Sequence, residues 1–258
     1  MLEVIREGGI ARVVLSRPEV GNAFNSELVA RVTEAWNELE GDQSVRVVVV
    51  TGAGKHFSAG ADLKWMMRMK DASEEENLRD AEATARLFHL IYNSSKAVVA
   101  RVNGAARAGA VGLIAACDLA VAVERATFGL SEVRIGLAPA VISPFLVRKM
   151  GVGVARRLFI TGEVFGASEA LRWGLVSHVA SAAEFDQTLD QLVANLLVCG
   201  PQAVAAAKSL SVAIAGMDLA QTERYTASFI ARLRRTPEAL EGMSAFLEHR
   251  DPSWCERK

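Results

Sequence analysis

The chain has 258 residues, of which 51% are hydrophobic and 23% charged, and its formal net charge is −1. This length allows a buried core without disulfide support, and a charge so near zero excludes a protein built to coat nucleic acid or an anionic membrane. The three cysteines are odd in number and far apart, which argues against a disulfide framework or a metal cluster. We expect a soluble cytoplasmic protein, since neither a signal core nor a run of about 18 apolar residues is present.

The first two-thirds of the chain alternates between strand and helix patterns. Residues 10–15 (IARVVL) form a short apolar run before a turn, which predicts a strand. Residues 26–40 carry apolar side chains at helical spacing, and residues 45–51 (VRVVVVT) are β-branched like a strand covered on both faces. Ser73 and Glu76 have the spacing of a capping box, so a helix should run from there to about Tyr92.

Strands are also predicted at residues 97–102 and 119–123, and the alternation indicates the α/β class. The pattern changes after about Ser181, where a second capping-box spacing with Glu184 begins. Pro201 then opens a further helix, and apolar periodicity continues to Leu247. The last third of the chain is therefore expected to be helical only.

Three glycine-bearing stretches lie between these elements. They are residues 51–64 (TGAGKHFSAGADLK), 103–118 (NGAARAGAVGLIAACD) and 128–139 (FGLSEVRIGLAP). Their order and spacing resemble those of the crotonases, the enoyl-CoA hydratase/isomerase superfamily, and the resemblance covers essentially the whole chain. It implies a crotonase (ClpP/crotonase-like) fold, in which a spiral of β-β-α units is followed by a helical trimerisation region.

The resemblance also implies an organisation. Residues 1–195 are expected to form the spiral core with the coenzyme A site, and residues 196–258 the helical oligomerisation region. A trimer or a dimer of trimers would follow. The substrate would be an acyl-CoA, with coenzyme A as part of the substrate and no separate cofactor.

Crotonase chemistry depends on a thioester enolate, whose oxygen gains negative charge during proton transfer at the neighbouring carbon. By resemblance, the backbone N–H groups of Ala61 and Gly109 stabilise this oxyanion. One such donor can contribute about 3 kcal/mol. Gly109 also begins a segment (AGAVGLIAAC) that we interpret as a buried helix, whose N-terminal dipole would add to the field on the oxygen.

Glu132 is the candidate for proton transfer, because the third stretch of the family carries a glutamate there. An apolar environment raises the pKa of a carboxyl group, which suits a general acid near neutral pH. The best-known hydratases carry a second glutamate at the position of Gly112, where this chain has no side chain. Water would then have to be held by Glu132 alone or by groups that the sequence does not identify.

Two reactions fit a single glutamate. The second and third stretches resemble bacterial hydratases of glutaconyl-type CoA esters (methylglutaconyl- or isohexenylglutaconyl-CoA), which favours addition of water to a 2-enoyl-CoA. The single-glutamate pattern is also typical of Δ3,Δ2-enoyl-CoA isomerases. A catalytically weak acyl-CoA binder is the alternative of a different class, and it is motivated by the missing glutamate.

The remaining candidates would bind substrate. By resemblance, the backbone of Ala23, Ala59, Gly60 and Leu63 lines the coenzyme A channel, and Lys64 is a candidate phosphate partner. Arg107 replaces a commoner apolar residue, and a guanidinium there could pair with a carboxylate on the acyl group. A surface arginine, or one paired with a nearby acid, explains Arg107 as well. The stretch 138–144 lacks the family's glycine run, so the acyl pocket should be lined differently.

Overall fold

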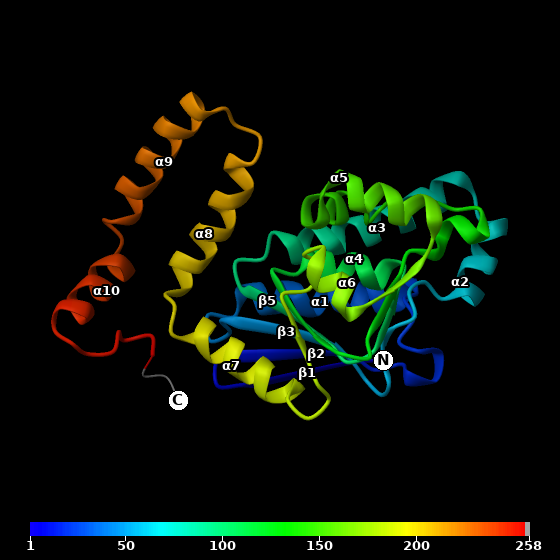
Figure 1. The fold of residues 1–258 in the computed structure, drawn as a ribbon, viewed down its shortest axis with the longest axis horizontal. Coiled ribbons are helices and arrows are strands. Elements are labelled where there is room, and N and C mark those ends of the chain that lie inside the picture. Colours follow the sequence, from blue (N-terminus) through cyan, green and yellow to red (C-terminus); the bar gives the residue numbers. More distant parts are fainter. Residues whose placement is uncertain (256–258) are drawn as a thin grey trace.

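The computed structural model describes residues 1–255, which form two β-sheets with helices around them (Figure 1). The larger sheet has the order β1-β2-β3-β5-β7-β10, with β1 antiparallel to β2 and the other neighbours parallel. Its strands are β1 (Leu2–Glu7), β2 (Ile10–Leu15), β3 (Val47–Gly52), β5 (Ala97–Val102), β7 (Leu119–Val123) and β10 (His178–Ala180).

The smaller sheet has the order β4-β6-β8-β9. Strands β4, β6 and β8 run parallel to one another, and β9 pairs antiparallel with β8. These strands have three residues each: β4 (His56–Ser58), β6 (Ala105–Arg107), β8 (Thr127–Gly129) and β9 (Val164–Gly166).

The chain repeats one supersecondary unit, in which a strand of the large sheet is followed by a strand of the small sheet and then by a helix. β3 and β4 lead to α2 and α3, β5 and β6 to α4, and β7 and β8 to α5. Parallel neighbours require such long return connections. The expected spiral of β-β-α units is therefore confirmed. The helices are α1 (Ser26–Gly41), α2 (Leu63–Arg68), α3 (Glu74–Tyr92), α4 (Gly109–Ala116), α5 (Ser143–Thr161) and α6 (Ala167–Arg172).

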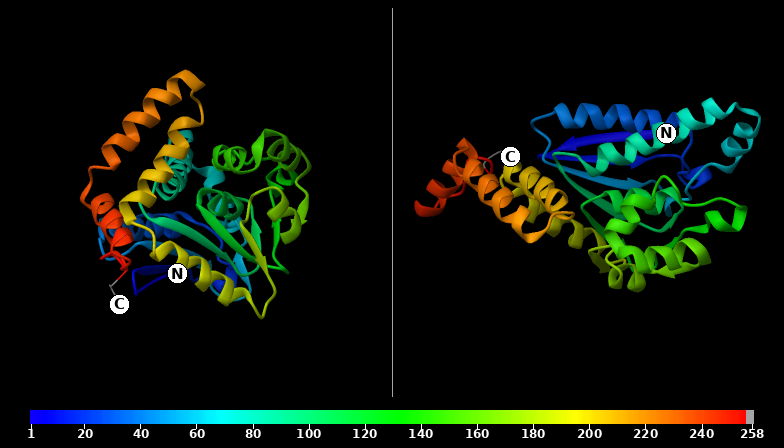
Figure 2. Two further views of the ribbon diagram at one scale, coloured as in Figure 1. Left: turned by 60° about the vertical axis from the view of Figure 1, so that its left-hand side comes forward. Right: turned by 90° about the horizontal axis from the view of Figure 1, so that it is seen from above.

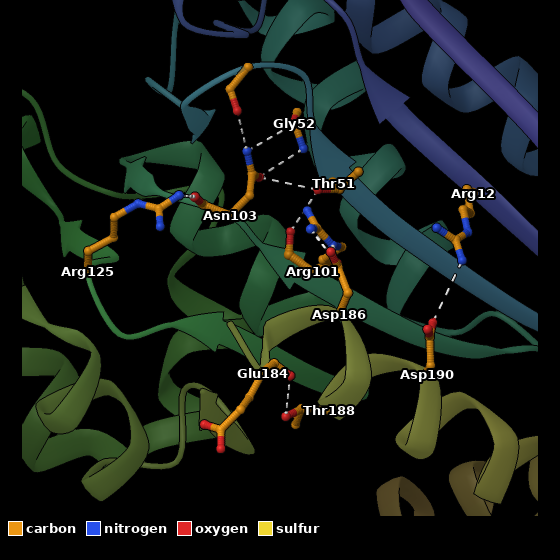
Figure 3. Close-up of polar contacts among 11 residues, drawn as sticks. Arg12, Thr51, Gly52, Arg101, Asn103, Arg125, Glu184, Asp186, Thr188 and Asp190 are labelled. Carbon is orange, nitrogen blue, oxygen red and sulfur yellow. Dashed lines mark hydrogen bonds and ion pairs between the residues drawn. The ribbon is translucent and has the colours of Figure 1, made fainter. Parts of the chain in front are cut away.

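The large sheet forms the core because both of its faces are covered. Residues 47–50 are all valine and all buried, as expected for a parallel strand between helical layers. α1 and α3 pack against each other, and α7 (Phe185–Leu197) contacts β3 and β7. Two ion pairs tie α7 to the sheet: Arg12 with Asp190 at 3.9 Å and Arg101 with Asp186 at 2.6 Å (Figure 3).

The helices after α7 form an arm that projects from the core (Figures 1 and 2). α8 (Pro201–Ile214) leaves α7 at a bend of 100°, and α9 (Leu219–Leu233) and α10 (Pro237–Leu247) follow. The predicted boundary at 195/196 falls within the last turn of α7. No single helix among residues 1–255 has the length and apolarity needed to cross a membrane; only the bent pair α7–α8 meets that test on length and composition.

Most predicted elements form at the expected residues. The strands at 10–15, 97–102 and 119–123 have the predicted bounds, and the Ser73–Glu76 capping box opens α3, which ends at Tyr92. At the second capping-box spacing, Ser181 and Glu184 do bond to each other, but α7 begins at Phe185, one residue after Glu184. The bonded pair thus closes a turn before the helix.

Candidate active site

One candidate residue from each of the three stretches follows one of three neighbouring parallel strands. Ala61 lies three residues after β4, Gly109 two residues after β6, and Glu132 three residues after β8. Because β4, β6 and β8 are parallel and adjacent in that order, their carboxyl ends meet at one edge of the small sheet. The fold therefore brings the two candidate amides and the candidate carboxyl group to the same edge, with Gly109 following the middle strand, β6.

The loops that carry the two amides touch each other. A Cβ on Gly60 would lie 2.6 Å from the carbonyl oxygen of Arg107 and 3.0 Å from Cβ of Ala108, and Gly60 has φ +88°. Only glycine combines this conformation with so close an approach. The amide of Ala108 donates to the carbonyl of Gly129 at 2.8 Å, which continues the pairing toward the segment of Glu132.

The amides of Ala61 and Gly109 are available to a ligand. Within residues 1–255, neither N–H donates a hydrogen bond, and both residues are half-buried. The backbone on both sides of Ala61 is fixed, since Phe24 donates to the carbonyl of Gly60 at 2.7 Å and Asp62 donates to the carbonyl of Phe24 at 2.8 Å. Unbonded N–H groups on a fixed backbone are the arrangement that oxyanion binding requires.

Ala108 has an unusual backbone conformation directly before the Gly109 amide. Its φ is 49° and its ψ is −121°, a region that glycine favours and other residues avoid. Such a conformation costs of order 1–3 kcal/mol and persists only where the surrounding structure enforces it. Here the Gly129 bond and the start of α4 fix the residue on both sides. The peptide that carries the Gly109 N–H is thus held in a defined direction.

Glu132 lies in a 3-10 helix (Ser131–Ile135) directly after β8. Its Oε2 atom is buried and has no hydrogen-bond partner within residues 1–255. Burial raises the pKa of this carboxyl group above its ordinary value. Removal from water disfavours the charged form, and a carboxyl group in such an environment is a candidate for proton transfer.

Gly112 lies on α4, and the side chain of Ile142 covers it. A Cβ on Gly112 would overlap Cβ and Cγ2 of Ile142 and would lie 3.5 Å from its Cδ1. Ile142 precedes α5 and is 4% exposed. The two departures from the family pattern, Gly112 and the segment 138–144 without its glycine run, are therefore in contact and form one structural feature.

Known proteins show the same arrangement of the chain. The family model for enoyl-CoA hydratase/isomerase matches residues 5–257. The chain belongs to this family. A Thermus thermophilus protein that carries an enoyl-CoA hydratase name is 39% identical over 248 residues, which is 96% of this chain and 98% of that protein.

Two further relatives support membership of the enoyl-CoA hydratase/isomerase family. Carnitinyl-CoA dehydratase of Escherichia coli K12 is 33% identical over 262 residues, which cover 98% of this chain and 97% of that protein. The crystal structure of an enoyl-CoA hydratase from Shewanella pealeana superposes with a TM-score of 0.95 at 37% identity, over 98% of this chain and 95% of that chain. The crotonase fold expected from the sequence is confirmed.

A buried polar network holds the loop that carries Ala61 in this member of the enoyl-CoA hydratase/isomerase family. Asn22, which is fully buried with φ 59°, donates through Nδ2 to the carbonyls of Ala53 and His56 at 2.9 and 3.0 Å. The hydroxyl of buried Ser58 donates to the carbonyl of Asn22 at 2.9 Å and accepts from the amide of Gly60 at 3.2 Å. The bonds of Asn22 join this loop to the turn that precedes α1, and the bond between Ser58 and Gly60 lies within the loop.

A second amide side chain joins the β3–β4 and β5–β6 connections (Figure 3). Asn103 donates through Nδ2 to the carbonyls of Gly52 and Gly54, both at 2.9 Å, and its Oδ1 accepts from the Gly52 amide and the Thr51 hydroxyl. Asn22 and Asn103 position the site without reaching it. The sequence alone did not identify them, because their partners are main-chain atoms far away along the chain.

Asp62 caps the short helix α2. Its carboxylate accepts from the amides of Lys64 at 3.1 Å and Trp65 at 3.3 Å. It also pairs with Arg17 at 3.1 Å, and both side chains are only 13% exposed. This pair, which the sequence did not reveal, fixes the segment directly after Ala61.

We predict that Asp62→Ala lowers the free energy of unfolding by about 2 kcal/mol, because it removes a helix cap and leaves Arg17 without its carboxylate. Asp62→Asn is the matched control, since its amide oxygen can still cap α2, and it should lose about half as much. Urea unfolding of both variants measures the difference. An equal loss of unfolding free energy in Asp62→Ala and Asp62→Asn would show that the helix cap contributes nothing to stability.

The predicted coenzyme A residues lie around this loop. Ala23 is buried and its carbonyl accepts from Arg17 at 2.6 Å, whereas Ala59 is exposed and its amide donates to Gly21 at 2.7 Å. Leu63 is 62% exposed, and Lys64 lies beside it, exposed, on the first turn of α2. Within residues 1–255 no carboxylate pairs with Lys64, so its ammonium group is available to a phosphate.

Arg107 lies on β6, but its guanidinium points back along the small sheet. It donates to the carbonyl and hydroxyl of Thr127 at 2.7 and 3.0 Å, and Thr127 is the first residue of β8. The candidate site lies past the other end of that strand. Burial lowers the pKa of the guanidinium, and within residues 1–255 no carboxylate is close enough to form an ion pair with it. Arg107 is thus half-buried and bonded to main-chain and hydroxyl oxygens of the small sheet.

Proposed function

We propose that the protein adds water to a 2-enoyl-CoA thioester, with Glu132 as its single acid–base group and the amides of Ala61 and Gly109 as the oxyanion hole. The observation that carries this proposal is the unpartnered, buried carboxyl oxygen of Glu132 at the sheet edge where two free amides also lie. Relatives named as an enoyl-CoA hydratase and a carnitinyl-CoA dehydratase give further support.

The steps of the proposed reaction balance with water as the only co-reactant. The Glu132 carboxylate takes a proton from water while the hydroxide oxygen bonds to the β-carbon of the substrate. The electron pair of the Cα=Cβ bond moves toward the thioester, and the charge on its oxygen is stabilised by the two amides. The protonated Glu132 then gives its proton to the α-carbon, which yields the 3-hydroxyacyl-CoA and restores the carboxylate.

One observation favours Δ3,Δ2-enoyl-CoA isomerisation as a second candidate. The place of a second carboxylate at Gly112 is covered by the hydrocarbon side chain of Ile142, so no second group there can hold water. In isomerisation, Glu132 would take a proton from the α-carbon of a 3-enoyl-CoA and return it to the γ-carbon. That reaction needs no water and uses the same oxyanion hole.

The test is a panel of acyl-CoA esters with analysis of the products by mass. Formation of a 3-hydroxyacyl-CoA from 2-enoyl-CoA supports hydration, and conversion of 3-enoyl-CoA without a change of mass supports isomerisation. The panel should include methylglutaconyl- and isohexenylglutaconyl-CoA, to which the motifs pointed. Tight binding without turnover, unchanged in Glu132→Gln, would replace both proposals by a non-catalytic acyl-CoA binder.

We predict that Arg107→Ala changes the rates with dicarboxylic and plain enoyl-CoA esters by the same factor. The guanidinium is anchored at Thr127, away from the carboxyl ends of the strands. Steady-state kcat/KM for both ester classes measures this, and Arg107→Lys serves as a control that keeps the charge. A loss confined to the dicarboxylic esters would instead make Arg107 the partner of the acyl carboxylate.

We also propose that the helical arm mediates self-association into a trimer or a dimer of trimers. Large apolar side chains of α9 and α10 are exposed, among them Leu219 at 90%, Phe246 at 81% and Leu247 at 77%. Single chains seldom leave such a concentration of apolar surface in water. Light scattering after size exclusion should give a trimer or hexamer mass that Phe246→Asp reduces. The exposed polar control Glu248→Gln should leave it unchanged, and a monomeric wild type would refute the proposal.

A further inference from the structure

The contact between Gly112 and Ile142 selects among the reactions open to this site. We propose that Ile142 is a specificity-determining residue, which fills with hydrocarbon the place from which a second acid–base side chain would reach the acyl group. Proton transfer is thereby confined to Glu132, and water is excluded from that side. This inference builds on the proposed function, because it concerns the same oxyanion hole and the same carboxyl group.

Ile142 covers Gly112 through particular atoms of its side chain, and we call this position of the side chain against Gly112 its seat. The contact with Gly112 involves the branch point Cβ and the methyl Cγ2, with Cδ1 further away. A β-branched side chain is therefore what closes this position, and an unbranched one would leave part of it open. Since Gly112 is buried and Ile142 is 4% exposed, the two residues pack as part of the core and leave no room for water between them.

The backbone holds Ile142 in this seat. Its carbonyl accepts from the amides of Phe145 and Leu146 at 3.2 and 3.3 Å, which is the first turn of α5. Phe145 in turn packs edge-on against Phe88 and His89 of α3, with ring centroids 6.1 and 5.3 Å apart. α5 also contacts the 3-10 helix that carries Glu132. Ile142 is thus fixed relative to both the α4 helix and the catalytic carboxyl segment.

The experiment compares Ile142→Val with Ile142→Ala. Valine keeps both carbons of the closest contact, whereas alanine removes Cγ2 and opens the seat. Two rates are measured for each protein: hydration of crotonyl-CoA, and deuterium exchange from D2O at the α-carbon of butyryl-CoA. The exchange needs the oxyanion hole and Glu132 but no addition of water.

We expect Ile142→Val to keep the wild-type ratio of hydration to exchange, and Ile142→Ala to change it severalfold by admitting water. Gly112→Glu should lower Tm strongly, because its Cβ overlaps Ile142. The double variant Gly112→Glu/Ile142→Gly, which removes both overlapping carbons, should recover much of that loss. It should also show a second ionisation in the pH profile of hydration, and a hydration rate about tenfold or more above that of Ile142→Gly alone.

Two results would overturn the inference. One is an identical ratio in wild type, Ile142→Val and Ile142→Ala, and the other is a Gly112→Glu protein as stable as the wild type. Failure of the proposed function looks different. In that case the wild type exchanges no deuterium at the α-carbon of any ester. The Tm values of the Gly112 and Ile142 variants would still show whether Ile142 fills the space beside Gly112.

Discussion

Glu132→Gln is expected to lower kcat by about 10² to 10⁴, the usual contribution of a positioned acid–base group, while acyl-CoA binding is retained. Glutamine has nearly the shape of glutamate, so the loss would report proton transfer and not packing. Product formation and equilibrium binding of a saturated acyl-CoA measure the two effects. Glu124→Gln is the matched control, because Glu124 is exposed and lies eight residues earlier in the chain.

The same substitution should raise stability. Burial raises the pKa of Glu132, so the unfolded chain ionises this carboxyl group at a lower pH than the native protein does. As pH rises through the interval between the two values, wild type loses stability and Glu132→Gln does not. Wild type and Glu132→Gln should have the same free energy of unfolding below a pH of about 4. At higher pH they should diverge by about 1.4 kcal/mol for each unit by which the pKa is raised.

The pH dependence of kcat/KM should report the same raised pKa of Glu132. Both hydration and isomerisation begin with Glu132 ionised, so kcat/KM of the wild type should fall as pH drops through the raised pKa. The midpoint is expected above about 4.3, the ordinary value for glutamate. Urea unfolding and pH–rate profiles of the same preparations check both results. An unchanged kcat in Glu132→Gln, or a profile without an acidic limb, would remove Glu132 from the chemistry.

Gly109→Pro is expected to lower kcat by about 10² to 10³, because proline has no N–H to donate to the thioester oxygen. Gly109 is the first residue of α4, so its N–H has no partner within the helix, while a proline there also disfavours the conformation of Ala108 before it. Within residues 1–255 this amide makes no hydrogen bond, so its removal breaks none.

Two variants separate the loss of the donor from the change of shape. Gly109→Ala keeps the N–H, and a Cβ at this position meets no protein atom within 4 Å, so its rate should stay close to that of the wild type. Glu74→Pro makes the same change at the first residue of α3, an exposed position, and should be fully active. A Gly109→Pro enzyme that folds, as judged by Tm, and turns over normally would exclude this amide from the oxyanion hole.

The sequence predicted those parts of the molecule that local chemistry determines. The β-branched run 47–50 had to be covered on both faces, and the Ser73–Glu76 box fixes the start of α3 whatever lies around it. The strand β1 was not predicted, because Leu2–Glu7 carries three charges and is stabilised by pairing with β2. The three-residue strands of the small sheet are too short to leave a periodic signal.

The candidate site was predictable in its composition but not in its contacts. Spacing and family likeness placed Ala61, Gly109 and Glu132, and the parallel pairing of β4, β6 and β8 explains why they share one edge. The seat of Ile142 on Gly112 depends on two segments thirty residues apart that meet only in the fold. Both segments depart from the family pattern in the sequence. Only the fold shows that they are in contact.

The strained conformation of Ala108 has a consequence for how a ligand is received. The direction of the Gly109 N–H is decided when the chain folds, so an arriving thioester does not need to reorganise this dipole. Replacement of Ala108 by glycine would relax the strain and let the amide sample other directions. Greater thermal resistance and slower turnover should then appear together, as two results of a single change in backbone freedom.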